Sequence, residues 1–158
     1  MRMGLGFDAH GFEAGRKLVL GGVTIEGEIG LAGHSDADVI SHSVADALLG
    51  AAGLGDLGSM FPNNDEWRDA SSLAILAETA SALTGAGWAI VNVDVTLIAE
   101  APRIAPHRTE MIDRVSSSLG IRADQVSMKA TTTDGLGATG RREGMASMAI
   151  ASIEPNKV

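Results

Sequence analysis

Hydrophobic and polar residues alternate along residues 88–99. One side of an extended chain there carries only apolar side chains, namely Val91, Val93, Val95 and Leu97. The other side carries Asn92, Asp94 and Thr96. A strand with one apolar and one polar face is typical of a sheet that helices cover on one side only.

Further helices and strands are predicted from the spacing of apolar residues and from glycines at the expected element ends. Helices are predicted over 37–53, 70–84 and 107–119, each followed or ended by glycine. Ser35 is a good N-cap for the first of them, with Asp38 three residues on as in a capping box. Strands are expected over 1–7, 126–131 and 143–153, and a β-ribbon over 18–20 and 23–25 around Gly21-Gly22. Residues 58–69 are predicted to form a loop.

Together these elements predict an α+β fold: a single domain over 1–158 with a mostly four-stranded mixed sheet, helices packed on one face and a small β-ribbon. The last strand is apolar on both faces. This is typical either of an ordinary central strand or of a strand that contacts another subunit, and both interpretations stay open. Aromatic residues make up only 3% of the chain, so small aliphatic side chains must form the core, which favours an oligomer.

Charge and composition exclude some classes of function. The net charge is −8 and no Lys/Arg cluster occurs, so no nucleic-acid partner is expected. No apolar run is long enough to span a membrane, and no membrane partner is expected. The predicted first strand begins at the first residues, so we expect no signal or transit peptide. The expected location is the cytoplasm, or the plastid stroma for a processed plant or algal chain. Without cysteines, any zinc must be held by His and carboxylate groups.

A metal-binding pattern lies in the first third of the chain. Asp8 and His10, two apart in extended chain, point the same way and can share one ion, although a lone Asp-x-His pair is more often a strand end with a surface histidine. His42 lies on a helical stripe with Asp38 and Asp46, and it completes a three-ligand set with an open position. Asp38 or Asp46 is a candidate partner for His42, and the sequence does not decide between them.

Other polar groups suggest contacts to an anion. His34 and Ser35 precede the predicted helix, where free amide groups favour phosphate. The run Thr131-Thr132-Thr133-Asp134 at a strand end offers hydroxyls and a carboxylate for phosphates and a hard cation, although threonine is also an ordinary strand residue. The loop 99–105 after another strand could present backbone groups to a base or simply connect two elements.

These segments, in this order, resemble the 2-C-methyl-D-erythritol 2,4-cyclodiphosphate synthase family. The resemblance covers about residues 1–153 and rests on an ordered set of short motifs, namely Gly6-Phe7-Asp8-Ala9-His10, Gly21-Gly22-Val23, His34-Ser35-Asp36-Ala37-Asp38 with His42, Asp46–Ala51, Gly55-Asp56-Leu57-Gly58, Phe61-Pro62, Asn92–Thr96, Ala101-Pro102, Lys129–Thr133 and Gly140-Arg141.

The resemblance implies an enzyme acting on 4-diphosphocytidyl-2-C-methyl-D-erythritol 2-phosphate, whose 2-phosphate attacks the β-phosphorus of its own diphosphate. CMP leaves and the cyclic diphosphate forms, a step of non-mevalonate isoprenoid synthesis. The protein's task is then to fold the substrate and neutralise charge. The resemblance also implies a homotrimer with active sites between subunits.

The family's functional residues carry over to positions in this sequence. Asp8, His10 and His42 would bind Zn²⁺ or another divalent transition metal, and Asp134 would bind Mg²⁺ or Mn²⁺. His34 and Thr132 would stabilise the developing charge. The erythritol phosphate end would contact Ser35, Asp56, Leu57, Gly58 and the loop Phe61, Pro62, Asn63, Asn64 and Asp65. Cytidine and its diphosphate would contact Ala99, Glu100, Ala101, Pro102, Arg103, Ile104, Ala105, Thr131, Thr132 and Thr133, with Ala138 and Arg141 nearby.

Three positions depart from the family pattern. Asn63 stands where Asp is common, Asp134 where Glu is common, and Ala138 where some members have a bulky aromatic residue. Two other functions use the same residues. A zinc phosphohydrolase would deliver water to phosphorus and release non-cyclic phosphate, and a non-catalytic module would bind metal and nucleotide without turnover.

Overall fold

A five-stranded mixed sheet forms one layer of the protein in the computed structural model, which describes residues 1–62, 64–65, 67–68 and 70–156. The strand order is β4-β1-β7-β5-β6, and all pairs are antiparallel except β5–β6. The strands are β1 (Arg2–Glu13), β4 (Gly30–Leu31), β5 (Trp88–Ile98), β6 (Val126–Thr131) and β7 (Gly144–Pro155). The predicted mixed sheet is confirmed, with the two-residue β4 as an additional edge strand.

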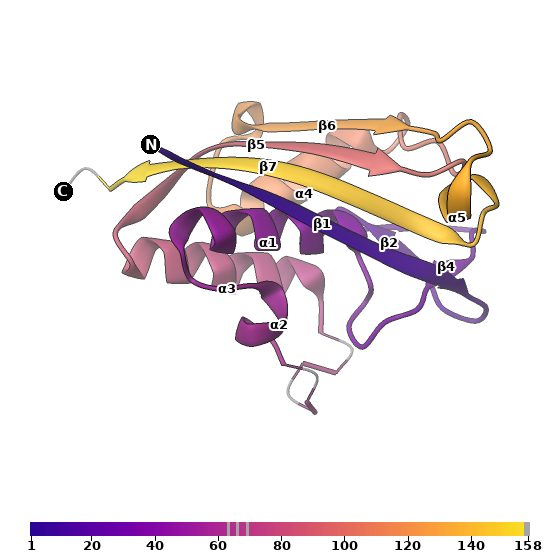
Figure 1. The fold of residues 1–158 in the computed structure, drawn as a ribbon, viewed down its shortest axis with the longest axis horizontal. Helices are drawn as coiled ribbons and strands as arrows, with labels where there is room; N and C mark the ends of the chain where they lie inside the picture. Colours follow the sequence, from indigo (N-terminus) through magenta and orange to yellow (C-terminus); the bar gives the residue numbers. More distant parts are fainter. Residues whose placement is uncertain (63, 66, 69, 157–158) are drawn as a thin grey trace.

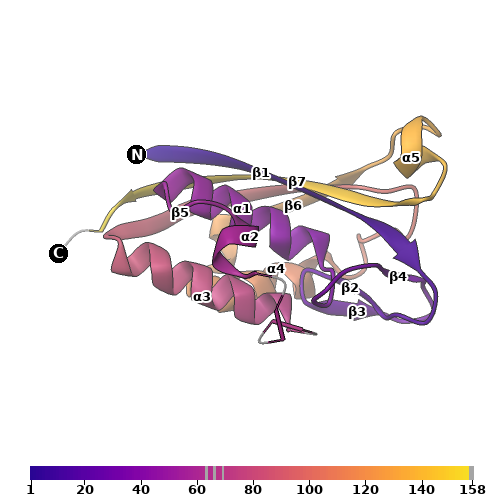
Figure 2. The same ribbon diagram turned by 60° about the horizontal axis from the view of Figure 1, so that its bottom comes forward.

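Three helices pack on one face of this sheet (Figures 1 and 2). They are α1 (Val39–Ala52), α3 (Ser72–Gly85) and α4 (Arg108–Leu119). Beside them, β2 (Leu18–Leu20) and β3 (Val23–Ile25) form the predicted ribbon. Shorter turns of helix are α2 (Leu57–Met60), η1 (Ala123–Gln125) and α5 (Gly137–Gly140). The α+β fold with helices on one side is therefore confirmed.

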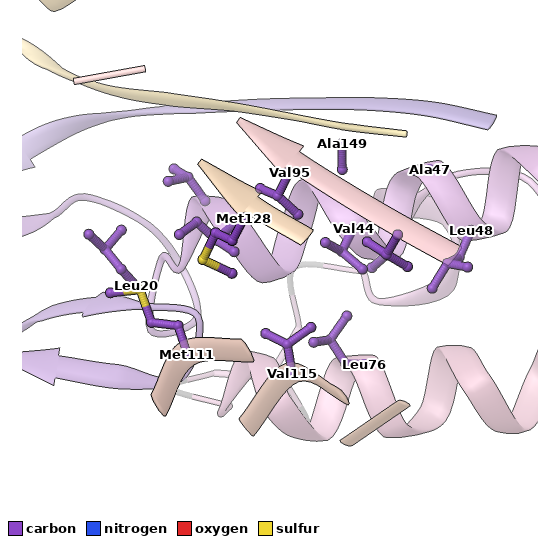
Figure 3. Close-up of a cluster of buried hydrophobic side chains, with 14 of the residues drawn as sticks. Leu20, Val44, Ala47, Leu48, Leu76, Val95, Met111, Val115, Met128 and Ala149 are labelled. Carbon is purple, nitrogen blue, oxygen red and sulfur yellow. The ribbon is translucent and has the colours of Figure 1, made fainter. Parts of the chain in front are cut away.

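The core lies between the sheet and the helices, and aliphatic side chains dominate it (Figure 3). Val93, Val95 and Leu97 of β5 are buried on the inward face, as the alternation predicted. Val91, predicted on the same face, is only half-buried, because the β5–β7 pairing is irregular between Ile90 and Asn92. Alanines at facing positions, such as Ala47 of α1 and Ala149 of β7, allow the helix to approach the sheet closely. Among the described residues, no helix is long and apolar enough to cross a membrane.

The opposite face of the sheet carries large apolar side chains that the described chain leaves exposed. They come from β1 and β7 and are Met3, Leu5, Phe7, Met148 and Ile150. In the β1–β7 register, Leu5 lies opposite Ile150 and Phe7 lies opposite Met148, so these side chains form one contiguous strip. The strand β7 is thus central in the sheet and is also apolar toward this open face. The interpretation as a central strand is confirmed, whereas contact with another subunit stays a prediction.

Three local predictions were wrong. β1 extends to Glu13 instead of ending at Phe7, because backbone pairing with β7 continues through His10 and Gly11. The N-cap of α1 is Asp38, whose carboxylate also accepts hydrogen bonds from the amides of Gly21 and Gly22, and not Ser35. The segment 58–69 begins inside α2, which Asp56 caps through the amide of Ser59.

Candidate metal centre

Asp8 and His10 lie within β1, and their side chains point toward the helical layer. Gly4 and Gly6 share this side of the strand and lie against α1 so closely that a Cβ on either would fall 2.0 Å from a backbone carbonyl oxygen of the helix. The alternation of the strand then places Asp8 and His10 on the same side as these glycines. The first strand therefore presents a carboxylate and an imidazole to the first turn of α1.

His42 comes from that first turn and meets both side chains. Its Nδ1 lies 2.9 Å from Oδ2 of Asp8, and Nε2 of His10 lies 3.0 Å from the same oxygen. The ligand atoms of the three residues all lie within 4.8 Å of one another. Among the described residues, this is the group of His and carboxylate side chains arranged to hold one metal ion.

The state of His10 fits a metal ligand. Its Nε2 is buried and, although it lies 3.0 Å from Oδ2 of Asp8, makes no hydrogen bond within the described structure. An orphaned buried nitrogen is costly unless another group satisfies it. Two imidazoles and a carboxylate are the donor set of many catalytic zinc sites, so the chemistry of the residues fits a divalent transition metal.

The three groups also shift one another's proton affinity. Burial raises the pKa of Asp8, but its contacts with His10 and His42 outweigh burial and bring the pKa well below its ordinary value. The Asp8 carboxylate raises the pKa of His10, an effect that burial partly opposes. Asp8 is therefore ionised at neutral pH, as a metal ligand must be.

The two helical aspartates do not support His42, contrary to the sequence interpretation. Asp38 caps α1 through the amides of Ile40 and Ser41, and Asp46 accepts a hydrogen bond from the amide of Leu57 at 2.9 Å. The reason is geometric: the ring of His42 points back toward β1 and α3 rather than along its own helical stripe. Its Nε2 instead lies 3.1 Å from Oγ of Ser35 and 3.0 Å from Oγ of Ser72.

A hollow of about 280 Å³ opens beside the three side chains. Its other lining residues include His34, Ser35, Leu57 and Phe61. Nε2 of His34 lies 2.7 Å from the carbonyl oxygen of Asn64. The free helix amides expected near His34 and Ser35 are taken by Asp38, because the helix starts four residues later than Ser35, at Val39. Any anion contact here therefore depends on side chains.

An adjoining hollow joins Asp8 and His42 to Asp56, Leu57 and Gly58. Of the remaining loop residues, Pro62 and Asp65 are exposed, and Asp65 pairs with Arg68 at 2.9 Å. Asn63 lies outside the described residues. One chain thus brings together the candidate metal ligands and most of the residues predicted to contact the erythritol phosphate end.

The second group of predicted site residues lies elsewhere on the chain. Thr131 of β6 lies opposite Ile98 of β5, Ile98 lies opposite Ala146 of β7, and Ala146 lies opposite Ala9 of β1. The backbones of Thr131 and Ala9 are therefore three strand spacings apart, roughly 14 Å. Residues in register share a face of the sheet, which places the Thr131 side chain on the face opposite Asp8 and His10. Thr132 and Asp134 are exposed beyond the strand end, joined by a hydrogen bond of 3.1 Å.

The loop 99–105 lies beside this second group. Oε1 of Glu100 accepts hydrogen bonds from the amides of Thr133 and Gly135, at 3.1 and 3.3 Å. Glu100 and Ala101 line a separate cavity of about 190 Å³. Arg141 forms an ion pair with Glu143 at 2.6 Å. Ala138, Arg103 and Ala105 are exposed, Pro102 is half-buried, and Ala99 and Ile104 are buried.

Comparison with known proteins places this geometry in a family. The model of the YgbB family matches residues 1–154. The chain belongs to the YgbB family. A relative from Desulfatibacillum aliphaticivorans, named a 2-C-methyl-D-erythritol 2,4-cyclodiphosphate synthase, is 54% identical over 155 residues, which are 98% of this chain and 100% of the relative. The family resemblance read from the motifs is thereby confirmed.

Two solved structures have the same fold as this chain. The bifunctional IspDF of Campylobacter jejuni superposes with a TM-score of 0.93 at 37% identity, covering 98% of this chain and 42% of that one. The CDP complex of Plasmodium falciparum IspF gives a TM-score of 0.87 at 33% identity, covering 99% of this chain and 97% of that one.

Sequence reasoning missed some residues that shape the candidate metal centre of this YgbB-family chain. Arg16 donates hydrogen bonds to the carbonyl oxygens of Gly33, at 2.8 Å, and of Ser35, and so holds the loop before α1. Trp67 packs edge-on against Phe61, with 4.8 Å between ring centroids, and lines the hollow that contains all three candidate ligands. Ser72 contacts His42. No local pattern marks these residues, because each acts through a contact distant in sequence.

Proposed function

We propose that this chain converts 4-diphosphocytidyl-2-C-methyl-D-erythritol 2-phosphate into 2-C-methyl-D-erythritol 2,4-cyclodiphosphate and CMP, as a phosphorus–oxygen lyase of non-mevalonate isoprenoid synthesis. The observation that carries the proposal is the hollow that joins Asp8, His10 and His42 to His34 and Ser35. Its relatives over the full chain length are named for this activity. The cytoplasmic location expected from the sequence stays a prediction.

The reaction is internal to the substrate. An oxygen of the 2-phosphate forms a new bond to the β-phosphorus, while the bond from that phosphorus to the oxygen bridging the two phosphates breaks. The bridging oxygen leaves with CMP and takes the electron pair, so no water and no covalent enzyme intermediate are needed. Since both partners belong to one molecule, the enzyme gains rate by holding them close and by neutralising charge.

Asp8, His10 and His42 would hold Zn²⁺, and Asp134, beside Thr132, would help to hold Mg²⁺. Such ions supply Lewis-acid polarisation of phosphate oxygens and reduce repulsion between phosphates. The ionised Asp8 and the orphaned Nε2 of His10 support the first site. The hydrogen bond between Thr132 and Asp134 places a hydroxyl beside a carboxylate at one exposed strand end, which supports the second site.

Residues of the chain itself would bind and orient the substrate. His34 lines the hollow beside the candidate metal ligands and would donate a hydrogen bond to the phosphate that gains charge, as would the hydroxyl of Thr132. The erythritol phosphate end would lie against Ser35 and the loop 56–65, where Asp56, Leu57 and Gly58 adjoin the metal ligands. The loop 99–105 and Thr131–Thr133 would hold cytidine and its diphosphate, with Ala138 and Arg141 nearby.

Because the two groups of residues lie apart in one chain, a complete site needs a second copy. The proposal is a homotrimer in which the metal half of each site comes from one chain and the cytidine half from its neighbour. A ring of three such head-to-tail contacts closes on itself. The exposed strip on β1 and β7 supports it: Leu5 and Phe7 are 61% and 57% exposed, values that favour burial against another copy.

Phosphorus NMR of the purified, zinc-loaded protein with the diphosphocytidyl substrate and Mg²⁺ tests this function. We expect CMP and a cyclic diphosphate, and we expect neither from the His42→Ala variant. Release of non-cyclic phosphate would instead indicate a zinc phosphohydrolase. Binding of CDP without any turnover would indicate a non-catalytic binding module.

A further inference from the structure

Ser72 connects His42 to a carboxylate outside the metal ligands. Ser72 is the first residue of α3 and is fully buried. Its Oγ lies 3.0 Å from Nε2 of His42 on one side and forms a hydrogen bond to Oδ1 of Asp36 on the other. The amide of Ser72 donates to the second oxygen of the same carboxylate at 2.8 Å. Asp36, Ser72 and His42 therefore form one continuous chain of hydrogen bonds.

The direction of each hydrogen bond in this chain follows from elementary chemistry. An ionised carboxylate can only accept, so the hydroxyl hydrogen of Ser72 points to Asp36. Only the lone pairs of Ser72 Oγ then face His42, and Nε2 must supply the proton that they accept. With a metal ion bound, His42 is a neutral imidazole with one proton; because Nε2 carries it, the lone pair of Nδ1 is free for the metal. Nδ1 is also the atom that lies 2.9 Å from Oδ2 of Asp8, the neighbouring candidate ligand.

We propose that Ser72, oriented by Asp36, is a positioning residue that fixes the ring orientation and the tautomer of His42 for metal binding through Nδ1. Ser35 adds a second hydroxyl 3.1 Å from Nε2, but it comes from the loop before α1 and its hydroxyl hydrogen has no carboxylate to direct it among its described contacts. It is therefore the hydrogen bond from Ser72 to Asp36 that determines which nitrogen of His42 carries the proton. This inference rests on the metal site of the proposed function.

Zinc affinity, measured by competition with a chromophoric chelator, tests the role of Ser72. We expect Ser72→Ala to lower the affinity about 10–100-fold, the usual effect of losing such a partner. The Co²⁺-loaded variant should show altered visible absorption bands, because the ring of His42 is no longer held. Ser72→Thr, which restores a hydroxyl, should recover affinity in part.

Ser43→Ala is the matched control. Ser43 is also a fully buried serine, one residue beyond His42, but its hydroxyl bonds to Ser147 and to the carbonyl oxygen of Ile40. It should retain the zinc affinity and the Co²⁺ spectrum of the parent chain even though it loses a buried hydrogen bond. Equal loss of zinc in Ser43→Ala and Ser72→Ala would overturn the proposal, as would unchanged affinity in Ser72→Ala.

Asp36→Asn tests the second link, and it keeps the proposal testable if Ser72→Ala folds poorly. Because Asp36 acts through Ser72, Asp36→Asn as a single substitution should lower zinc affinity. Added to Ser72→Ala, it should lower the affinity no further. Independent, additive losses would contradict the chain of hydrogen bonds. None of these readouts depends on turnover, so a protein that binds zinc as described but forms no cyclic product would contradict the proposed function alone.

Discussion

Gly6 of β1 lies directly against Ser43 of α1: a Cβ on Gly6 would fall 2.0 Å from the carbonyl oxygen of Ser43. This close approach brings the first turn of α1 down onto the strand two residues before Asp8. His42, next to Ser43, can then reach the Asp8 carboxylate. The missing side chain at Gly6 is thus a condition for the metal site as well as for the packing.

Gly6→Ala should therefore harm both stability and metal binding. The new methyl group meets backbone rather than a flexible side chain, so we expect a loss of roughly 2–3 kcal/mol in the free energy of unfolding. Zinc affinity should fall as well, because α1 must move away from β1. Guanidinium unfolding and a zinc competition assay measure the two effects.

Gly50→Ala serves as the control for this change, since Gly50 also lies in α1 but a Cβ there meets nothing within 4 Å. It should leave zinc affinity unchanged and raise stability by about 0.5–1 kcal/mol. Zinc affinity unaltered in Gly6→Ala would show that the approach of helix and strand does not shape the site.

His42→Ala should abolish zinc retention while the fold remains largely intact. The core between sheet and helices is continuous without this side chain, and His42 contributes polar contacts rather than apolar packing. Metal analysis after dialysis and circular dichroism check the two parts of this expectation. Global unfolding of the variant would mean that the metal is structural.

Zinc binding should release protons, with a pH dependence set in part by His10. Its contact with Asp8 raises its pKa above the ordinary 6.5, so near that pH a metal ion must displace a proton from His10. Apparent zinc affinity should rise with pH through this window, and proton release should fall toward zero above it. Calorimetry in buffers of different ionisation enthalpy measures the protons released.

The same contact has the opposite effect on the metal-free fold. A raised folded-state pKa stabilises the fold below pH 6.5, and this contribution is lost as the pH rises through the raised pKa.

His107→Ala changes a histidine at the start of α4, away from the site, and should leave the zinc profile unchanged. Absence of proton release at pH 6.5 would contradict the assignment of His10 as a ligand.

Mixing two inactive variants tests whether each site is built from two chains. His42→Ala lacks the metal half and Thr132→Ala lacks the cytidine half. If neighbouring chains supply the halves, co-expression in equal amounts should restore about a quarter of the parental activity, because each half is intact in half of the chains. A mixture as inactive as either variant alone would place both halves within one chain.

Local patterns predicted much of this fold. The alternation from Val93 to Leu97 gave the right face of β5, and it failed at Val91, where the pairing with β7 is irregular. The glycines around the helices gave their ends to within one or two residues. Ser35 was predicted to cap α1, with Asp38 three residues on, but Asp38 is itself the cap. Asp38 prevails because its carboxylate also satisfies the amides of Gly21 and Gly22, a tertiary contact that no local pattern contains.

The candidate metal ligands were found from spacing because Asp8 and His10 are close in sequence and His42 lies on a helix that follows. Their partners were not. Ser72 reaches His42 across 30 residues, and its serine is indistinguishable in sequence from its neighbour Ser71, the cap of α3. Similarly, β1 was predicted too short because its polar residues interrupt the apolar run although their backbone pairing continues.

The central claim is that the site holds the β-phosphate for attack by the 2-phosphate of the same substrate molecule, and that it does not activate water. Turnover in water enriched in ¹⁸O, with mass spectrometry of the products, tests this directly. The account predicts a cyclic diphosphate and CMP that contain no oxygen from the solvent. A phosphate product carrying solvent ¹⁸O would contradict it and would identify the protein as a hydrolase.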